Sequence, residues 1–409
     1  MIEHRALKTI GMFAAFVSLL GLRTQTAYRA QFPLPDMTVP NGLGVNIHII
    51  VPRDNSIEML AKAGFRWIRM DLAWEQVEHE RGLYDFSGYD KLMSQLYRHG
   101  LRAIFILDYG NKLYQEGAPR SSDARAAFVR FAHATLQHYR HAGVVWEMYN
   151  EPNIRFWKPE PNVNEYIQLA KDVGREVREN EPDEWYIGPG VAGMDMKFLD
   201  ACLDGGLLDY WDAVSAHPYR PKAPETVAAD YERLESDIAD HSAGKHVPII
   251  CSEWGYTDLA VGQEVQSQYV VREYLTNLSH GIPITIWYDW SDDALDKRNP
   301  GEAHFGIVSN DLSPKPALAS VQALVRELSG WKLSRKLNDD GSFKALEFKK
   351  GSHGKIVAWA TGTTARASID IPSGKHHLTV LGGDISTIRV EGGVIQLELR
   401  PVPLVISKS

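Results

Sequence analysis

The first three quarters of the chain alternate between short apolar runs and longer segments whose apolar residues recur at helical spacing. Continuously apolar runs are typical of parallel strands that are buried on both faces. Eight such runs lie at residues 44–50, 65–71, 101–108, 146–151, 186–190, 212–216, 248–253 and 284–290. The helical pattern predicts helices between them, notably at residues 56–64, 89–99, 122–141, 164–180, 228–240 and 265–280, with Asn164 as an N-cap. This alternation indicates a closed (β/α)8 barrel, a TIM barrel of the α/β class, rather than an open sheet.

The pattern changes after Ser329-Gly330, where helical spacing stops and short alternating stretches take over. These predict strands at residues 343–348, 355–360, 366–371, 378–381, 388–391 and 394–399. Gly392-Gly393 predicts a hairpin between the last two. We therefore expect a catalytic barrel over residues 31–330 and a small β-sandwich over 331–409. Trp331 and Trp359 are the candidate sugar-stacking side chains of the sandwich, although a packing role is favoured.

Residues 1–30 resemble a secretory signal peptide. Arg5 and Lys8 precede an apolar run over residues 10–22, and small residues follow it. A run of that length is too short to span a bilayer comfortably, so no stable membrane insertion is expected beyond this segment. We predict a secreted or periplasmic protein, with an uncleaved N-terminal anchor as the alternative.

Charge and cysteine content exclude several function classes. Without residues 1–30 the chain carries 40 basic and 51 acidic residues, a net charge of 40 − 51 = −11. Nucleic acid and anionic membranes are therefore disfavoured as partners, because phosphate groups require clustered cations. Cys202 and Cys251 cannot form a disulfide framework or a zinc cluster. Cys251 is predicted to be a buried free thiol, and a single disulfide is left open.

Polar and aromatic residues gather where the predicted strands end, which is where barrel enzymes carry their active sites. These residues are His48, Arg69, Asp71, Asp108, Asn150, Glu151, His217, Glu253, Trp287 and Asp289.

Two of these strand ends carry a glutamate in a similar setting, Glu151 in WEMYNEPN (146–153) and Glu253 in PIICSEWG (248–255). Hydrolysis of a glycosidic bond requires such a pair, one carboxylate below the sugar ring and one protonated acid beside the leaving oxygen. Glu151 would then carry a proton at neutral pH, while Glu253 stays ionised. Arg69 and Tyr219 are expected to keep Glu253 in that state.

The other acidic and histidine residues have ordinary interpretations beside functional ones. Glu147 lies inside its strand and is expected to pair with an arginine such as Arg69 in the barrel interior. Glu75 and Glu78 are predicted to be solvated charges. His48 and His217 could pack in the core, although the position of His217 favours a function.

No cofactor or catalytic metal is expected, because none of the 15 histidines forms a metalloprotease-type pair. For Asp292, Asp293 and Asp296, a solvated acidic turn is favoured over a calcium loop. Residues 154–161 and 291–304, which follow the fourth and eighth strands, are predicted to form the walls of the site.

Taken together, these motifs resemble the retaining glycoside hydrolases of clan A over residues 42–330. The motifs are NEP on strand four, SEWG on strand seven, Arg69 on strand two, His217-Pro218-Tyr219 after strand six and Trp287 on strand eight. GLYDFSGYD (82–90) after Trp74-Glu75 is similar to families 39 and 42, and the sandwich suits family 39 and related bacterial exopolysaccharide hydrolases.

The resemblance implies roles for individual residues. Glu151 would be the general acid/base and Glu253 the nucleophile. Asn150 would bind the sugar 2-hydroxyl, Tyr219 and Arg69 would tune Glu253, and Trp287 would form the floor under the sugar. The sequence departs from the pattern at WYDW (287–290), where Trp290 competes with Trp287. The candidates for sugar stacking in strand-end loops are Trp74, Trp157, Trp254 and Trp290.

The sequence thus predicts a retaining glycosidase that cleaves a polysaccharide or oligosaccharide by double displacement. A transglycosylase of the same mechanism and a catalytically inactive carbohydrate-binding protein are the alternatives.

Overall fold

The computed structural model describes residues 29, 31–48, 50, 55–293, 301–339 and 341–409. The predicted signal segment, residues 1–30, lies outside the described residues apart from Arg29, and so does Asp296 of the predicted acidic turn. Within the described part of the chain, no helix combines the length and the apolar character that crossing a membrane would require.

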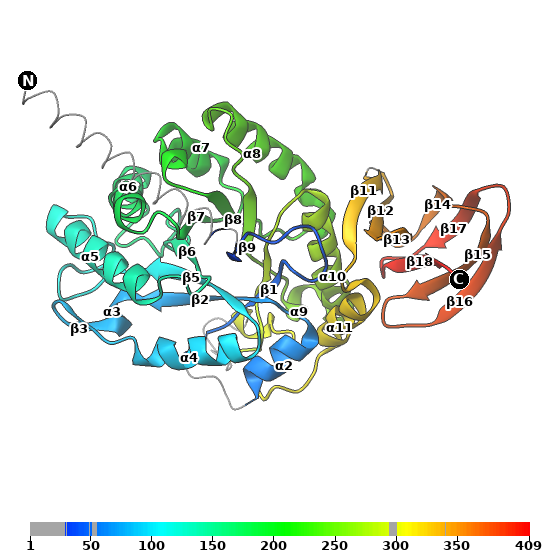
Figure 1. The fold of residues 1–409 in the computed structure, drawn as a ribbon, viewed down its shortest axis with the longest axis horizontal. Coiled ribbons are helices and arrows are strands. Elements are labelled where there is room, and N and C mark those ends of the chain that lie inside the picture. The colour runs from blue at the N-terminus through cyan, green and yellow to red at the C-terminus, as the bar shows by residue number, and fades with distance from the viewer. Residues whose placement is uncertain (1–28, 30, 49, 51–54, 294–300, 340) are drawn as a thin grey trace, which may run out of the picture.

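Eight parallel strands close into a barrel in the order β1-β10-β9-β8-β7-β6-β5-β2 (Figure 1). The strands are β1 (Leu43–Asn46), β2 (Trp67–Ala73), β5 (Arg102–Asp108), β6 (Val145–Met148), β7 (Trp185–Ala192), β8 (Ala213–His217), β9 (Ile249–Trp254) and β10 (Thr285–Trp287). Val45 aligns with Trp287 on one side and Ile68 on the other, which closes the ring. The predicted barrel and its eight strands are confirmed, with ends that differ by a few residues.

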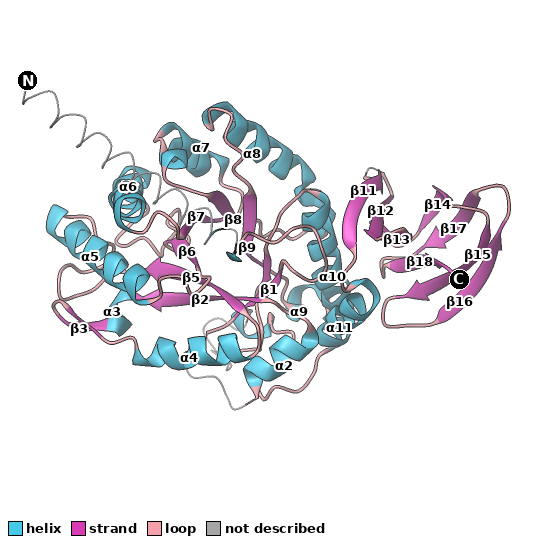
Figure 2. Ribbon diagram, viewed as in Figure 1, coloured by secondary structure: helices cyan, strands magenta, loops and turns pink. Residues whose placement is uncertain are grey.

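Helices surround the strands, as Figure 2 shows by colour. They are α2 (Ser56–Ala63), α3 (Trp74–Val77), α4 (Ser87–Arg98), α5 (Ser122–His138), α6 (Val163–Asn180), α7 (Met196–Asp204), α8 (Ala228–His241), α9 (Asp258–Val261), α10 (Gln263–Ser279) and α11 (Pro316–Leu328). The short 3-10 helices are η1 (Leu207–Asp209), η2 (Pro224–Val227) and η3 (Glu302–His304). The predicted cap of α6 was wrong by two residues, because the side chain of Asn162 accepts hydrogen bonds from the amides of Asn164 and Glu165.

The barrel is filled by apolar side chains from alternate positions of its strands. One buried cluster inside the ring contains Trp67, Ile104, Val145, Ile187, Ala213, Ile250, Ile284 and Ile286. A larger cluster lies between the strands and the helices. Cys202 and Cys251 are buried and unpaired, which confirms the prediction for Cys251. The barrel interior is therefore packed, and polar side chains reach solvent at the ends of the strands.

Antiparallel strands follow α11 and form two sheets. A six-stranded sheet has the order β11-β12-β13-β18-β15-β16, a two-stranded sheet pairs β14 with β17, and a short β3-β4 ribbon (Glu78–Glu80, Leu83–Tyr84) belongs to the barrel. The strands are β11 (Lys332–Asn338), β12 (Phe343–Lys350), β13 (His353–Ala360), β14 (Ala365–Asp370), β15 (Gly374–Val380), β16 (Ile385–Val390), β17 (Val394–Leu399) and β18 (Leu404–Lys408). A second apolar core, which includes Ala358, Ile369, Ile395 and Ile406, joins the sheets as a small sandwich.

The hairpin predicted at Gly392-Gly393 was wrong. β16 pairs with β15, whereas β17 pairs with β14, so the two glycines connect strands of different sheets. Both have φ near +80° (78° and 79°), a backbone conformation that glycine adopts without steric cost. The two glycines therefore lie in the connection that passes from one sheet to the other.

The sandwich contacts the barrel through a buried ionic group. Arg272 on α10 donates two 2.7 Å hydrogen bonds to the carboxylate of Glu225, and Trp359 on β13 donates a 2.6 Å bond to Glu225 Oε1. All three side chains are buried. The favoured packing role of Trp359 is thus confirmed. Glu225 connects a barrel helix to the sandwich and neutralises a buried arginine.

We predict that Glu225→Ala destabilises the protein by about 3–5 kcal/mol, because it leaves the Arg272 charge buried without a partner. Urea unfolding followed by tryptophan fluorescence measures the change. The control is Glu58→Ala, which breaks the exposed pair between Lys62 and Glu58 and should leave the transition nearly unmoved. Equal shifts for both variants would contradict the role of Glu225.

Candidate active site

A single buried arginine organises the carboxyl end of the barrel. β2 places Arg69 inside the ring with 1% of its surface exposed. Its Nε donates to Glu147 Oε2 at 2.6 Å, Nη1 to Glu253 Oε2 at 2.5 Å, and Nη2 to Asn150 Oδ1 at 2.9 Å. The predicted pairing of Glu147 with Arg69 is confirmed. The guanidinium therefore fixes side chains from β6, the loop after it and β9 around one point.

The chain turns sharply where it carries Glu151. β6 ends at Met148, three residues earlier than predicted, and both Tyr149 and Glu151 have positive φ angles of 66° and 46°. Such angles cost a non-glycine residue about 1–3 kcal/mol and are frequent at active sites. The Glu151 amide donates to Gly190 O at 2.9 Å, which anchors the turn to β7. The turn directs Glu151 toward β8 and β9.

His217, at the end of β8, holds one oxygen of Glu151. Its Nδ1 lies 3.0 Å from Glu151 Oε1, and its Nε2 lies 3.3 Å from Arg69 Nη2. Arginine can only donate, so Nε2 faces a donor, whereas Nδ1 can donate its proton to Glu151. The Oε2 atom of Glu151 is left to face the cavity.

Glu253, at the end of β9, is held by two donors. Tyr219 donates its hydroxyl to Oε1 at 2.9 Å, and Arg69 binds Oε2. Burial alone would raise the pKa of Glu253, but nearby His217, the Arg69 guanidinium and the Tyr219 hydroxyl lower it below its ordinary value. Carboxylate oxygens of Glu151 and Glu253 lie within 4.8 Å of each other. Two neighbouring carboxylates thus have different hydrogen-bonding environments.

Both glutamates open into a cavity of about 420 Å³. Its lining includes His48, Asp71, Tyr109, Asn150, Phe156, Tyr288 and Phe305. The amide of Asn150 donates to the Tyr109 hydroxyl at 3.1 Å. Residues 154–156 form part of the wall, as the sequence predicted for the segment after the fourth strand. Tyr109, Tyr288 and Phe305 were not predicted, although alternation along WYDW would have placed Tyr288 opposite its tryptophan neighbours.

Four predicted sugar-stacking tryptophans lie elsewhere, which corrects the sequence interpretation. Trp287 donates to Phe305 O and Trp290 to Ser56 Oγ, and neither lines the catalytic cavity. Trp157 and Trp254 are fully buried. These indoles fill space between strands and helices, where their area stabilises packing.

Trp74 also belongs to the core rather than the site. It stacks on Tyr114 with 5.2 Å between ring centroids, and its Nε1 donates to Glu78 Oε2 at 2.5 Å. Glu78 is 1% exposed and also accepts hydrogen bonds from the Tyr114 hydroxyl and the Gly82 amide. The prediction that Glu78 is a solvated charge was therefore wrong, whereas Glu75 is exposed as expected.

His48 lies at the edge of the cavity with 41% of its side chain exposed. Burial lowers its pKa, but the hydrogen bond and charge of Asp289, 3.5 Å away, raise the pKa to about 9. His48 is therefore a cation at neutral pH, next to the Tyr288 ring at 5.4 Å. This position suits the predicted role in substrate binding better than a core role.

Two groups of side chains have donor atoms spaced for a metal. In the first, Glu151, His217 and Glu253 already bind one another or Arg69. In the second, Asp258, Asp292 and His304 surround the buried ammonium of Lys315, which lies 2.9 Å from both aspartates. Lys315 thus supplies the positive charge near the predicted acidic turn, and the absence of a catalytic metal stays a prediction.

Asp71 and Asp108 form a second pair of carboxyl groups beside Arg69. Asp108 is fully buried, and its oxygens accept no hydrogen bond from a donor group within the described residues. Burial, followed by the charge of Asp71, raises the pKa of Asp108 well above its ordinary value. The protonated form of Asp108 is therefore favoured, and its carboxyl can donate to Asp71.

A closed (β/α)8 barrel with two glutamates at the ends of β6 and β9 is the arrangement of a glycoside hydrolase. The comparison with known families agrees: residues 35–293 match the model of cellulase (glycosyl hydrolase family 5), and the chain belongs to that family. The protein is a glycoside hydrolase of clan A.

Relatives place the chain near other families of the same clan. Ninety-nine residues are 31% identical to the β-xylosidase of Geobacillus stearothermophilus, a match that covers 23% of this chain and about a fifth (19%) of that protein. A family 39 glycoside hydrolase from Bacteroides cellulosilyticus WH2 superposes with a TM-score of 0.79 at 24% identity, over 92% of this chain and 81% of that one.

Two further solved structures share the fold. A β-xylosidase from Caulobacter crescentus CB15 gives a TM-score of 0.67 at 17% identity and covers 89% of this chain and 95% of that one. A family 30 endoxylanase from Clostridium papyrosolvens C71 gives a TM-score of 0.64 at 13% identity. The match covers 92% of this chain and 98% of that one. The resemblance to clan A is confirmed, and the family 39 structure has the same fold as this chain.

We predict that Asp108→Asn stabilises the protein, and more so at pH 7 than at pH 4. The folded state holds a proton on Asp108 that the unfolded chain releases above its pKa of about 3.9, so stability falls as pH rises. Asparagine keeps a donor for Asp71 without this cost. Urea unfolding at several pH values measures the difference, and a gain independent of pH would contradict a protonated Asp108.

Proposed function

We propose that the protein is a retaining glycosidase that uses Glu253 as nucleophile and Glu151 as general acid/base. The observation that carries this proposal is their proximity, since one carboxylate oxygen of Glu151 lies within 4.8 Å of one carboxylate oxygen of Glu253. Retaining glycosidases hold their carboxyl groups about 5–5.5 Å apart, whereas inverting enzymes need about 6.5–9.5 Å to admit a water. The hydrogen bonds of each glutamate support the division of roles.

In the first step, ionised Glu253 attacks the anomeric carbon of the sugar while Glu151 gives a proton to the leaving oxygen. His217 occupies Glu151 Oε1, so Oε2 delivers the proton. The C–O bond to the leaving group breaks and an ester between the sugar and Glu253 forms. Arg69 and Tyr219 stabilise Glu253 as a carboxylate before attack and as a leaving group afterwards.

In the second step, Glu151 takes a proton from water, which attacks the anomeric carbon and releases Glu253. Asn150 lines the cavity next to Glu151, with its oxygen on Arg69 and its NH₂ group facing Tyr109. This amide is placed to bind the sugar 2-hydroxyl, a contact that strengthens as positive charge develops. His48 and Tyr288 would contact the same sugar from the opposite wall.

We infer that β-linked xylose chains are the first substrates to examine, because the relatives include two β-xylosidases and an endoxylanase. Bacterial exopolysaccharides are the second class. The sequence of residues 1–30 supports secretion or a periplasmic location. Release of reducing ends from both classes of polymer tests the function, and hydrolysis of none of them by the wild type would contradict it.

We predict that Glu253→Ala lowers kcat by more than about 10³-fold on every substrate, because no covalent intermediate can form. Circular dichroism should show an intact fold. Glu264→Ala, an exposed glutamate on α10, is the matched control and should retain full activity. Wild-type turnover in Glu253→Ala would remove this residue as the nucleophile.

We predict that Glu151→Ala slows hydrolysis of a natural oligosaccharide by about 10²–10⁴-fold. The same variant should slow formation of the glycosyl-enzyme from a 2,4-dinitrophenyl glycoside far less. The dinitrophenolate leaves without a proton, so the general acid is dispensable for it. The burst phase measures this step. Glu179→Ala, an exposed glutamate on α6, is the control. Equal losses on both substrates would exclude the acid role.

A further inference from the structure

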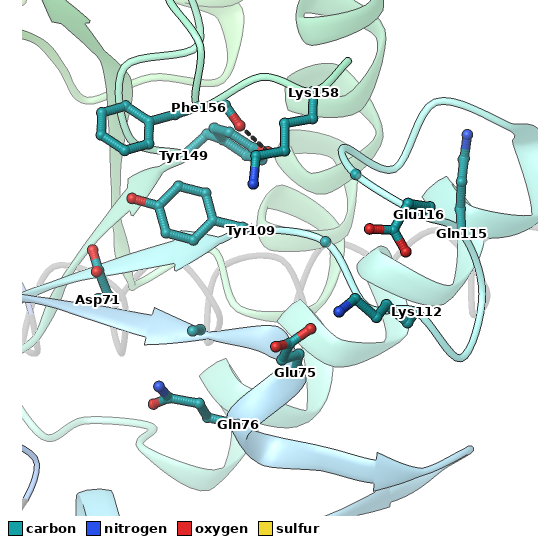
Figure 3. Close-up of a pocket in the computed structure, with 13 residues that line it drawn as sticks. Asp71, Glu75, Gln76, Tyr109, Lys112, Gln115, Glu116, Tyr149, Phe156 and Lys158 are labelled. Atoms are coloured by element: carbon teal, nitrogen blue, oxygen red, sulfur yellow. Dashed lines mark hydrogen bonds between the residues drawn. The ribbon is translucent and has the colours of Figure 1, made fainter. Parts of the chain in front are cut away.

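A second cavity of about 470 Å³ adjoins the catalytic cavity. The two share Asp71, Tyr109 and Phe156 in their linings, so they are parts of one groove. The second cavity extends over α3 and is bounded by the loops that follow β5 and β6 (Figure 3). Its size is within the range of about 300–1,000 Å³ that small-ligand sites occupy.

One side of this second cavity is aromatic. Figure 3 shows the rings of Tyr109, Tyr149 and Phe156 grouped together, with the Tyr149 hydroxyl donating to Phe156 O at 3.3 Å. The ring of Tyr109 lies 5.5 Å from that of Tyr149 and 5.9 Å from that of Phe156. Tyr149 is fully buried, so the partly exposed rings of Tyr109 and Phe156 offer the apolar surface on which a pyranose ring packs.

The wall opposite is built from a tight loop. A Cβ added to Gly110 would lie 1.8 Å from Gly117 O, and Gly117 has φ +79°. Only glycine permits this close approach of two backbone segments. The loop therefore keeps a fixed shape and presents Lys112 and Glu116 beside the cavity.

Four charged side chains line the cavity without a partner. Glu75, Lys112, Glu116 and Lys158 make no side-chain hydrogen bond or ion pair within the described part of the chain. In Figure 3 the ammonium group of Lys158 points toward the middle of the cavity, while Glu75 and Lys112 approach from the other end.

The balance of charge indicates what would bind. Two cations and two anions cancel, so an anionic ligand would meet Glu75, Glu116 and Asp71, and an apolar ligand would leave all of them unsatisfied. Sugar hydroxyls both donate and accept hydrogen bonds, and can therefore satisfy groups of either sign.

We propose that this cavity is a second sugar subsite, which binds a neutral saccharide unit next to the unit in the catalytic cavity. The proposal rests on the proposed glycosidase function. Tyr109 and Phe156 lie at the junction, where the two sugar units meet, and Lys158 binds hydroxyls of the outer unit. The enzyme then selects chains of two or more sugars over single-sugar glycosides.

The test compares kcat/KM for 4-nitrophenyl glycosides with that for oligosaccharides of two to five units, in neutral xylose, glucose and mannose series. We expect kcat/KM to rise at least about tenfold with chain length in one series. Lys158→Ala should lower the ratio of long-chain to single-sugar kcat/KM by about tenfold, the effect of losing one hydrogen bond to a charged group. Lys197→Ala, an exposed lysine on α7 outside both cavities, should change neither value.

The outcomes separate this inference from the proposed function. Hydrolysis that depends on Glu253 but shows the same chain-length ratio in wild type and Lys158→Ala overturns the subsite alone. Preference for oligosaccharides with a glucuronic acid branch over neutral ones of equal length overturns the neutral assignment. If the wild type hydrolyses none of the neutral series, both the subsite and the proposed hydrolysis of neutral saccharides are overturned.

Discussion

The buried guanidinium of Arg69 is the interaction on which the site depends. Moving such a charge into the barrel is costly unless partners compensate it fully, and here Glu147 and Glu253 supply two carboxylates within 2.6 Å. The planar fork of arginine can bind both of them and Asn150 at fixed angles. One residue on β2 therefore sets the geometry of groups contributed by β6 and β9.

The two proposed catalytic glutamates lie at the same end of the barrel, yet their neighbours differ. Glu253 receives a full positive charge and a phenol hydroxyl, which favour its ionised form. Glu151 receives one donor, the His217 ring, and its other oxygen faces the cavity. Two glutamates from β9 and the end of β6, separated in the barrel by β7 and β8, thus have different hydrogen-bonding partners, which supports the proposed division between acid and nucleophile.

The sequence predicted features that depend on local pattern and failed where tertiary packing decides. Continuous apolar runs located the barrel strands, and a glutamate inside a strand correctly indicated a partner for Arg69. The sequence pattern could not reveal that Tyr149 and Glu151 adopt positive φ angles. The strand β6 was therefore predicted to extend beyond Met148, where it ends. Trp287 and Trp290 were the two candidates for the floor under the sugar, but Tyr288, which lies between them, lines the cavity, because neighbouring residues in a strand point to opposite faces. Gly392-Gly393 permitted a turn without specifying which sheet each strand joins.

The walls of the groove differ in how their charges are used. On the side formed after β10, the ammonium of Lys315 binds Asp258 and Asp292, and this buried bridge supports the segment that carries Tyr288 and Phe305. On the side formed after β5 and β6, the charges of Lys112 and Lys158 have no partner among the residues that the structure describes. A charge that is already neutralised internally contributes rigidity, whereas an unpaired one can gain a hydrogen bond when a ligand arrives. In the proposed function, the first wall fixes one sugar for reaction, and the second contributes to the choice of chain.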